Sequence, residues 1–159
     1  MDTALFNLEE VLDNYTLKGE YCGYSVLNNG HINNTYMINF ATDEGEKSYI
    51  LQQINTAVFK DPDVLMKNYI GVTDFVRSKV AENGGDPKRE AVKVYCTNSG
   101  NSYFIDKEGR YWRIINYITD TVSYNFPDNA EICRSAGKAF GKFQQILADY
   151  PIDRLYETI

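Results

Sequence analysis

Apolar and polar residues alternate along the first third of the chain, after a short segment with helical spacing. Apolar positions three and four residues apart, with two acidic residues early, predict a helix over Phe6–Tyr15. Turn residues at Asn28-Asn29-Gly30 and Asp43-Glu44-Gly45 separate the alternating runs, which predicts an antiparallel meander. The three strands of this meander are expected at Tyr21–Leu27, Thr35–Phe40 and Lys47–Ile54.

The next segment keeps a period of about 3.6 residues and predicts one long helix over Pro62–Glu82. Asp61 suits the N-cap, Pro62 the first helical position, and Asp63 the acidic first turn. The glycine-rich run from Asn83 to Pro87 ends this pattern.

Strand signals then return before a second long helix. Turns at 98–101 and 107–110 predict two hairpins, formed by strands at Val92–Thr97, Ser102–Asp106 and Tyr111–Ile118. A helix opens at Pro127-Asp128-Asn129-Ala130, and its apolar face carries Ile132, Ala136, Ala139, Phe140, Phe143 and Leu147. The predicted fold class is α+β, with an antiparallel sheet of five to six strands and a long helix.

Composition and charge narrow the function classes. The chain has 159 residues, 43% of them apolar and 14% aromatic, which suffices for the packed core of one domain or slightly more. Its 16 basic and 22 acidic residues give a net charge of −6, and the scattered basic residues predict no nucleic-acid partner. No apolar run approaches the ~20 residues that span a bilayer, and the N-terminus is acidic. We therefore expect a cytoplasmic protein without a membrane partner.

The connection at Asn28–Thr35 is the strongest candidate binding element. Its backbone N–H groups and side-chain amides could donate hydrogen bonds to the oxygens of a phosphate. An ordinary hairpin turn is the alternative, because Asn-Gly pairs are common in hairpins for geometric reasons. His31, the single histidine, could also donate to a phosphate, although exposed loop histidines often have no role.

Several runs carry a resemblance to a known family. They are Gly30–Tyr36, Tyr49–Thr56, Val58–Pro62, Gly109–Arg113 and Ala139–Gln144. With them the chain resembles the N-terminal part of the aminoglycoside phosphotransferase-like kinases, which share the protein-kinase fold, and more narrowly the N-acetylhexosamine 1-kinase group. The resemblance implies a nucleotide-binding N-terminal lobe at 1–118, followed at 119–159 by a hinge and the first helix of a C-terminal lobe.

The resemblance also assigns roles to single residues. Gln52 stands where such kinases commonly place a lysine or arginine that reaches the α- and β-phosphates, and Lys67 stands where they often have an acid. A neutral Gln52 cannot offset the negative charge of the phosphates, so either another cation takes this role or phosphate binding relies on a metal ion. The alternative for Gln52 is a strand residue that faces solvent. The nucleotide-binding residues implied in this way are Gly30, His31, Asn33, Thr35, Gln52, Asn116 and Ile118.

The Asn116–Ile118 segment matches the hinge whose main chain binds adenine in this fold. Val26, Ile50 and Ile115 would then supply apolar walls for the base, and all three could equally be core residues.

For the whole kinase, the resemblance implies transfer of the ATP γ-phosphate to the anomeric hydroxyl of an N-acetylhexosamine, with ATP and Mg²⁺. No catalytic or metal-binding residue is expected within this chain, because none of its later aspartates has the required context. The chain alone is therefore expected to be inactive, and the sugar pocket is expected in the C-terminal lobe. The alternative is a non-catalytic module that binds nucleotide or associates with itself through the apolar helix at 128–150.

Overall fold

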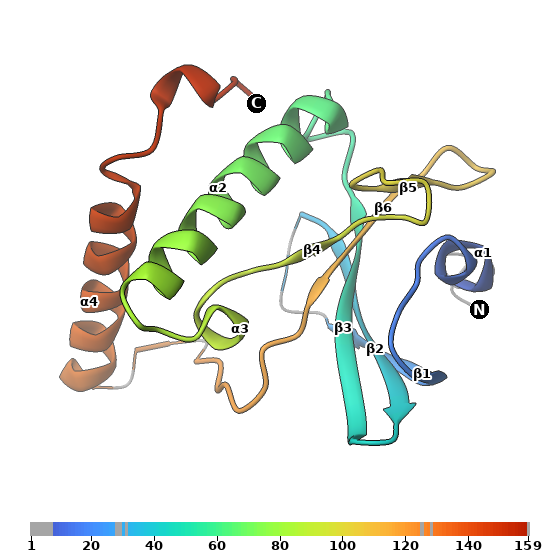
Figure 1. The fold of residues 1–159 in the computed structure, drawn as a ribbon, viewed down its shortest axis with the longest axis horizontal. Coiled ribbons are helices and arrows are strands. Elements are labelled where there is room, and N and C mark those ends of the chain that lie inside the picture. Colours follow the sequence, from blue (N-terminus) through green and yellow to red (C-terminus); the bar gives the residue numbers. More distant parts are fainter. Residues whose placement is uncertain (1–7, 28–29, 31, 125, 128, 159) are drawn as a thin grey trace.

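An antiparallel six-stranded sheet lies at the centre of the structure (Figure 1). The structure is a computed structural model that describes residues 8–27, 30, 32–124, 126–127 and 129–158. Strands follow the order β1, β2, β3, β6, β4, and β5 also pairs with β6. With its helices the described chain belongs to the α+β class. The predicted roles of Asn28, Asn29, His31 and Asp128, and the predicted helix start at Phe6, lie outside the described residues.

The predicted meander is confirmed. It consists of β1 (Glu20–Leu27), β2 (Asn34–Thr42) and β3 (Gly45–Ile54), paired antiparallel in sequence order. Gly45 closes the β2–β3 turn with a φ of 111°, a conformation that favours glycine. The Thr42 hydroxyl donates to the Gly45 carbonyl at 2.7 Å across this turn. Turn chemistry therefore sets the register here, as the sequence predicts.

The first of the two later hairpins was wrongly predicted. β4 (Val94–Tyr95) and β5 (Phe104–Ile105) do not pair with each other but both pair with β6 (Tyr111–Asn116). Because β3 occupies the other edge of β6, β4 and β5 are two pieces of one edge strand. The segment between them closes on itself, with the Thr97 N–H donating to the Asn101 carbonyl at 2.8 Å. The turn residues at 98–101 thus belong to a loop that interrupts the edge strand rather than to a hairpin.

One face of the sheet is covered by α1 (Leu8–Asp13). The core on this side is mostly aromatic and branched apolar residues: Val11, Tyr15, Tyr36, Ile38, Phe40, Tyr49, Leu51, Trp112 and Ile114. Burying such side chains contributes ~1.5–3 kcal/mol each before entropy is subtracted. This core therefore holds β2, β3 and β6 together.

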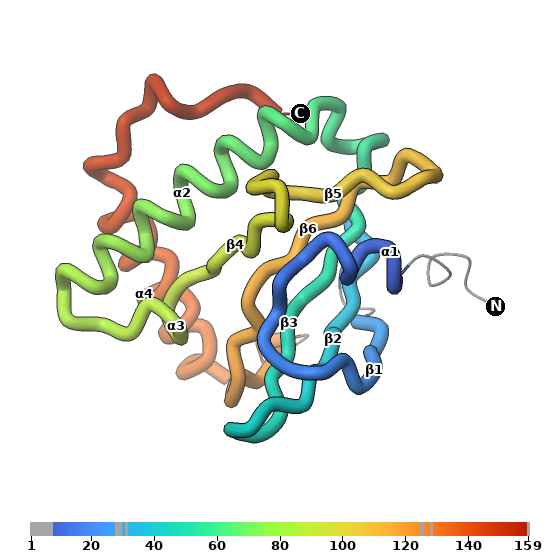
Figure 2. The backbone as a smooth tube through the Cα atoms, turned by 45° about the vertical axis from the view of Figure 1, so that its right-hand side comes forward, coloured from blue at the N-terminus to red at the C-terminus, as the bar shows by residue number. Residues whose placement is uncertain are grey.

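The long helix α2 (Pro62–Glu82) lies on the opposite side of the sheet (Figures 1 and 2). It begins as predicted, with Pro62 in the first turn and the Asp61 carboxylate accepting from the Val64 N–H at 3.0 Å. The short α3 (Pro87–Glu90) follows, capped in the same way by Asp86. An Asx cap followed by proline thus starts both helices.

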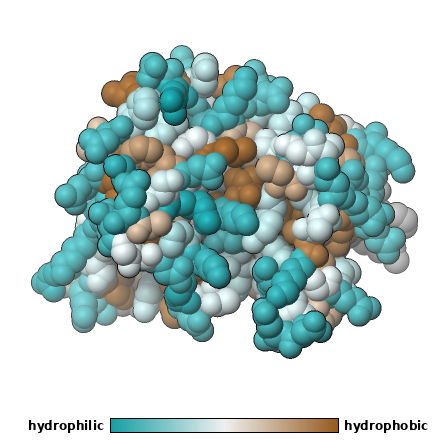
Figure 3. Space-filling model, in the orientation of Figure 1, coloured by the Kyte–Doolittle hydropathy of each residue, from teal (hydrophilic) through white to brown (hydrophobic). Residues whose placement is uncertain are grey.

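The C-terminal part lies alongside α2 (Figure 2). It contains α4 (Ala130–Leu147) and the single 3-10 turn η1 (Ile152–Arg154). A second small core forms between α2 and α4, around Val76, Val80 and Ala91 with Ile146 and Leu147. Figure 3 shows an apolar patch between α2 and the strands, surrounded by hydrophilic residues.

Candidate functional site

A row of polar residues crosses the sheet on the side of α2. Thr35 of β2 is paired with Gln52 of β3, and Gln52 is paired with Arg113 of β6. Directly paired residues of an antiparallel sheet point to the same face, so the three side chains are neighbours. The sheet therefore brings the end of the Asn28–Thr35 connection next to two residues that are distant in sequence.

Arg113 is the central charged group of this row, and it is only 6% exposed. Its Nε and Nη2 atoms donate to Oε1 of Gln52 at 3.0 and 2.9 Å. Its guanidinium lies 4.1 Å from the ring centroid of Tyr69, and Nη1 contacts the Met66 sulfur at 3.7 Å. Burial lowers the pKa of Arg113, yet an arginine keeps its charge in a folded protein.

Among the described residues, no carboxylate lies within 4.0 Å of the Arg113 guanidinium. A buried charge is costly unless an opposite charge or strong hydrogen bonds compensate it. Here an amide oxygen and an aromatic face provide that compensation. The net charge of this row is therefore positive, which favours an anion beside it.

Arg113 also orients the amide of Gln52. Because Oε1 accepts two guanidinium N–H groups, Nε2 is turned away from Arg113 and donates to Oγ1 of Thr35 at 3.2 Å. An amide nitrogen has two N–H groups, so a second donor remains at this end of Gln52. Gln52 thus presents a donor toward the β1–β2 connection, with a buried cation behind it.

Sequence reasoning assigned Gln52 to this site but missed Arg113. The available signal was a single arginine between Trp112 and Ile114 in an otherwise apolar strand. Its partner could not be identified without the register of β3 and β6. Lys67 does not face this row: it is exposed, and Met66 and Tyr69 are the α2 residues that reach the sheet.

The base of the β1–β2 connection is tied to the end of β3. Oδ1 of Asn33 accepts from the Asn55 N–H at 3.0 Å, and Nδ2 of Asn55 donates to the Ile32 carbonyl at 3.0 Å. The Thr35 hydroxyl donates to the Asn33 carbonyl at 3.4 Å. Gly30 is exposed on the same segment. These bonds hold the predicted residues Asn33 and Thr35 close to Gln52.

Asn116, which was predicted to contact nucleotide, makes structural hydrogen bonds. Its backbone N–H donates to the Lys93 carbonyl at 3.0 Å, and its Oδ1 accepts from the Lys93 N–H at 2.7 Å. Its Nδ2 donates to the Ala91 carbonyl at 3.2 Å. Ile118 is half-buried, and within the described residues its N–H has no hydrogen-bond partner. The N–H of Ile118 can therefore still donate to a ligand, whereas its carbonyl accepts from the Thr121 hydroxyl at 3.3 Å and the N–H of Asn116 is engaged.

The three residues predicted to form an apolar wall do not all lie on the same face of the sheet. Met37, Ile50 and Ile115 are paired in one row and share the face of Gln52. Val26 is paired with Tyr36 in the row of Leu51, which belongs to the core on the α1 side. Successive strand residues alternate between faces. Placing Val26 beside Ile50 and Ile115 was therefore wrong, and Met37 takes that place.

No family model matches this chain. Among helices of the described residues, none is both long enough and apolar enough to cross a bilayer. Within the same part of the chain, no three His, Cys, Asp or Glu residues gather as potential metal ligands.

Proposed function

We propose that the chain is the nucleotide-binding N-terminal lobe of a protein-kinase-like small-molecule kinase of the N-acetylhexosamine 1-kinase type. The single observation that carries the proposal is the buried Arg113, which lacks an acidic partner among the described residues and holds the Gln52 amide toward the β1–β2 connection. A cation in a low-dielectric site attracts phosphate more strongly than one in water. Arg113 thereby supplies the positive charge that Gln52 lacks.

In this proposal the connection at Asn28–Thr35 covers the ATP phosphates, and Gln52 donates to a phosphate oxygen. Met37, Ile50 and Ile115 form the wall for the base, and the backbone at Ile118 binds its edge. The lobe extends over 1–118, and 119–159 provides the hinge and the first helix of the C-terminal lobe.

The complete kinase would join the anomeric oxygen of the sugar to the γ-phosphorus of ATP, while the bond to the β,γ-bridging oxygen breaks and ADP leaves. Mg²⁺ and an aspartate base belong to the C-terminal lobe in this scheme. A chain that also carries that lobe is expected to release ADP with N-acetylglucosamine or N-acetylgalactosamine, and no release with either sugar would contradict the acceptor assignment.

Calorimetric titration of the chain with ATP tests the nucleotide half of the proposal. Arg113→Met keeps the apolar contact with Tyr69 and removes the charge, so ATP affinity should fall ~10-fold or more, whereas adenosine affinity should change little. Arg134→Met on the exposed surface of α4 is the matched control and should leave both affinities unchanged.

Failure of the wild-type chain to bind ATP, or equal ATP affinity of the Arg113→Met variant, would contradict the proposal. Arg113→Met removes both donors to Oε1 of Gln52, which should cost ~1–3 kcal/mol of stability. The melting temperature of Arg113→Met therefore separates lost binding from lost folding.

A second candidate is a non-catalytic, self-associating module. The observation in its favour is the exposure of large apolar side chains after β6, above all Val122 at 73%, Phe126 at 76% and Phe140 at 71%. Exposed apolar surfaces of this kind often mark interfaces. Light scattering on the samples used for calorimetry discriminates the two, since a concentration-dependent oligomer without ATP binding supports only this candidate.

A further inference from the structure

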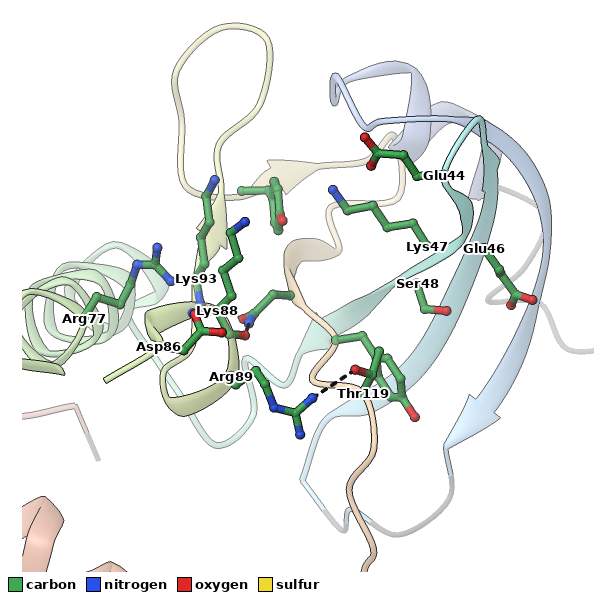
Figure 4. A pocket seen from close by; sticks show the side chains of 13 residues that line it. Glu44, Glu46, Lys47, Ser48, Arg77, Asp86, Lys88, Arg89, Lys93 and Thr119 are labelled. Carbon is green, nitrogen blue, oxygen red and sulfur yellow. Dashed lines mark hydrogen bonds between the residues drawn. The ribbon is translucent and has the colours of Figure 1, made fainter. Parts of the chain in front are cut away.

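A cavity of about 770 Å³ opens where β3 extends beyond β6. The pairing of these strands begins at Tyr49 and Asn116, so the start of β3 from Gly45 to Ser48 has no neighbour on β6. α3, the residues around Lys93 and the chain that leaves β6 enclose the resulting notch (Figure 4). The size lies within the usual range of small-molecule sites, ~300–1,000 Å³.

Basic side chains from three elements and from the segment before β4 line this cavity. They are Lys47, Arg77, Lys88, Arg89 and Lys93, against the acidic Glu44, Glu46 and Asp86. Figure 4 shows Lys47 extending into the space from β3, and Lys88 and Lys93 standing on the opposite wall. The chain as a whole has more acidic than basic residues, 22 against 16. The cavity therefore has the opposite charge balance to the rest of the chain.

Most of these cations have no carboxylate in direct contact among the described residues. Within the described residues, no carboxylate lies within 4.0 Å of Lys47, Arg77, Lys88 or Lys93. Glu44 pairs with Lys18 at 2.8 Å, and Asp86 caps α3. The hydrogen bond from Lys18 and, at longer range, the charges of Lys47 and Lys88 lower the pKa of Glu44. Like charges that converge without a counter-ion repel one another, so an anion between them is favoured.

Two of the lysines are held in place by aromatic rings. The ammonium of Lys47 lies 5.1 Å from the centroid of the Tyr49 ring, and that of Lys93 lies 4.8 Å from the Tyr95 ring. The two rings contact each other edge to face, with centroids 5.1 Å apart. Cation–π contacts of this kind restrict flexible side chains. The two cations are therefore partly pre-arranged, and Tyr95 itself lines the cavity.

We propose that this cavity binds a small molecule with two or more linked phosphate groups. Lysine ammonium groups bind phosphate as point charges, and several of them suit a ligand whose charge is spread over two or three phosphates. The site is separate from the phosphate end of the proposed ATP site, since Ser48 and Gln52 are about 13 Å apart along β3. It adjoins the proposed base end, because Asn116, Tyr117 and Thr119 line the cavity. It also borders the exit of β6, because Lys93 is hydrogen-bonded to Asn116 and Arg89 to Thr119.

Calorimetric titration with pyrophosphate and with tripolyphosphate, at constant ionic strength, tests this inference. One-to-one binding is expected, with tripolyphosphate the tighter ligand. Lys88→Gln/Lys93→Gln should weaken both affinities ~10-fold or more. The matched control is Lys60→Gln/Lys138→Gln, two exposed lysines elsewhere, which should leave the affinities unchanged.

Arg113→Met should also leave pyrophosphate affinity unchanged, so the outcome is separate from that of the ATP experiment. Absence of binding, equal losses in the control pair, or an equal response to sulfate would overturn the proposal. A normal melting temperature of the Lys88→Gln/Lys93→Gln variant shows that folding is intact, and Lys47→Gln from the opposite wall provides an independent variant with the same expected loss.

Discussion

The two long helices of this molecule use their apolar faces in opposite ways. α4 is the more amphipathic of the two, yet none of its residues is fully buried. α2 has the weaker pattern and buries Pro62, Met66, Val76 and Val80. The same contrast separates the sheet from the segment that leads into α4. Ile38 and Trp112 of the sheet are at most 2% exposed, whereas Val122 after β6 is 73% exposed.

This contrast shows that amphipathicity and burial are separate properties. The spacing of apolar residues decides that a helix has an apolar face. Whether that face is covered depends on what packs against it. Part of α2 packs against the sheet, whereas α4 packs against the C-terminal half of α2 and against Ala91. We therefore expect mutations in the sheet to affect global stability and equivalent mutations in α4 to have little effect.

The largest expected difference is between Trp112 and Phe140. Trp112→Ala removes a buried ring that also donates to Asp106, and should lower the free energy of unfolding by ~3–5 kcal/mol. Phe140→Ala removes a ring that is 71% exposed and should cost no more than ~0.5 kcal/mol. Urea denaturation followed by circular dichroism measures both, and similar losses would refute the contrast.

Asp106 should give the next largest effect. Its carboxylate accepts from Nε1 of Trp112 at 2.8 Å and from Nε and the backbone N–H of Arg110 at 2.7 and 2.9 Å. Asp106→Asn turns an acceptor into a partial donor among these groups and should cost ~1–3 kcal/mol. Asp149→Asn, at a side chain 79% exposed, is the control and should be near neutral.

The same carboxylate should make stability depend on pH. Burial raises the pKa of Asp106, but hydrogen bonds from Trp112 and Arg110 lower it by more, so the folded-state pKa lies below the usual value. Its contribution is therefore complete above the unfolded pKa of ~3.9 and is lost as pH falls through the folded pKa. Urea denaturation measures the free energy of unfolding at each pH. Between pH 6 and pH 3 this free energy should fall less in Asp106→Asn than in the wild-type chain. Equal falls in the two proteins would exclude a contribution of Asp106 to the pH dependence.

The smallest effects should come from the helix caps. Asp61 caps α2 through the Val64 N–H at 3.0 Å, and Asn129 caps α4 through Glu131 and Ile132, also at 3.0 Å. Replacing either by alanine should cost its helix ~1 kcal/mol. In Asp61→Ala the loss should appear in global unfolding, whereas in Asn129→Ala it should appear only as faster amide exchange within α4. Equal global losses would show that α4 unfolds together with the sheet.

Local chemistry made much of the fold predictable. The Asp61-Pro62 pair marks the start of α2, and the turn at Gly45 sets the β2–β3 register, because both signals act over a few residues. The sequence analysis paired β4 with β5 wrongly, because a turn signal does not show whether the flanking segments form a hairpin or continue along the same edge after a loop. Gln52 was identified through the resemblance, whereas the face of Val26 and the partner of Gln52 required the observed register.

By itself, then, the sequence determined the long helices, the meander and their order, and the apolar faces of the two long helices, since these depend on spacing and on short-range capping and turn chemistry. Only the tertiary structure decided which faces are covered and which distant residues meet. It placed Arg113 behind Gln52. It also brought lysines of β3, of α3 and of the segment before β4 to the wall of one cavity. Contacts of this kind depend on strand register and on how elements far apart in the chain pack together. No local sequence pattern encodes either of these.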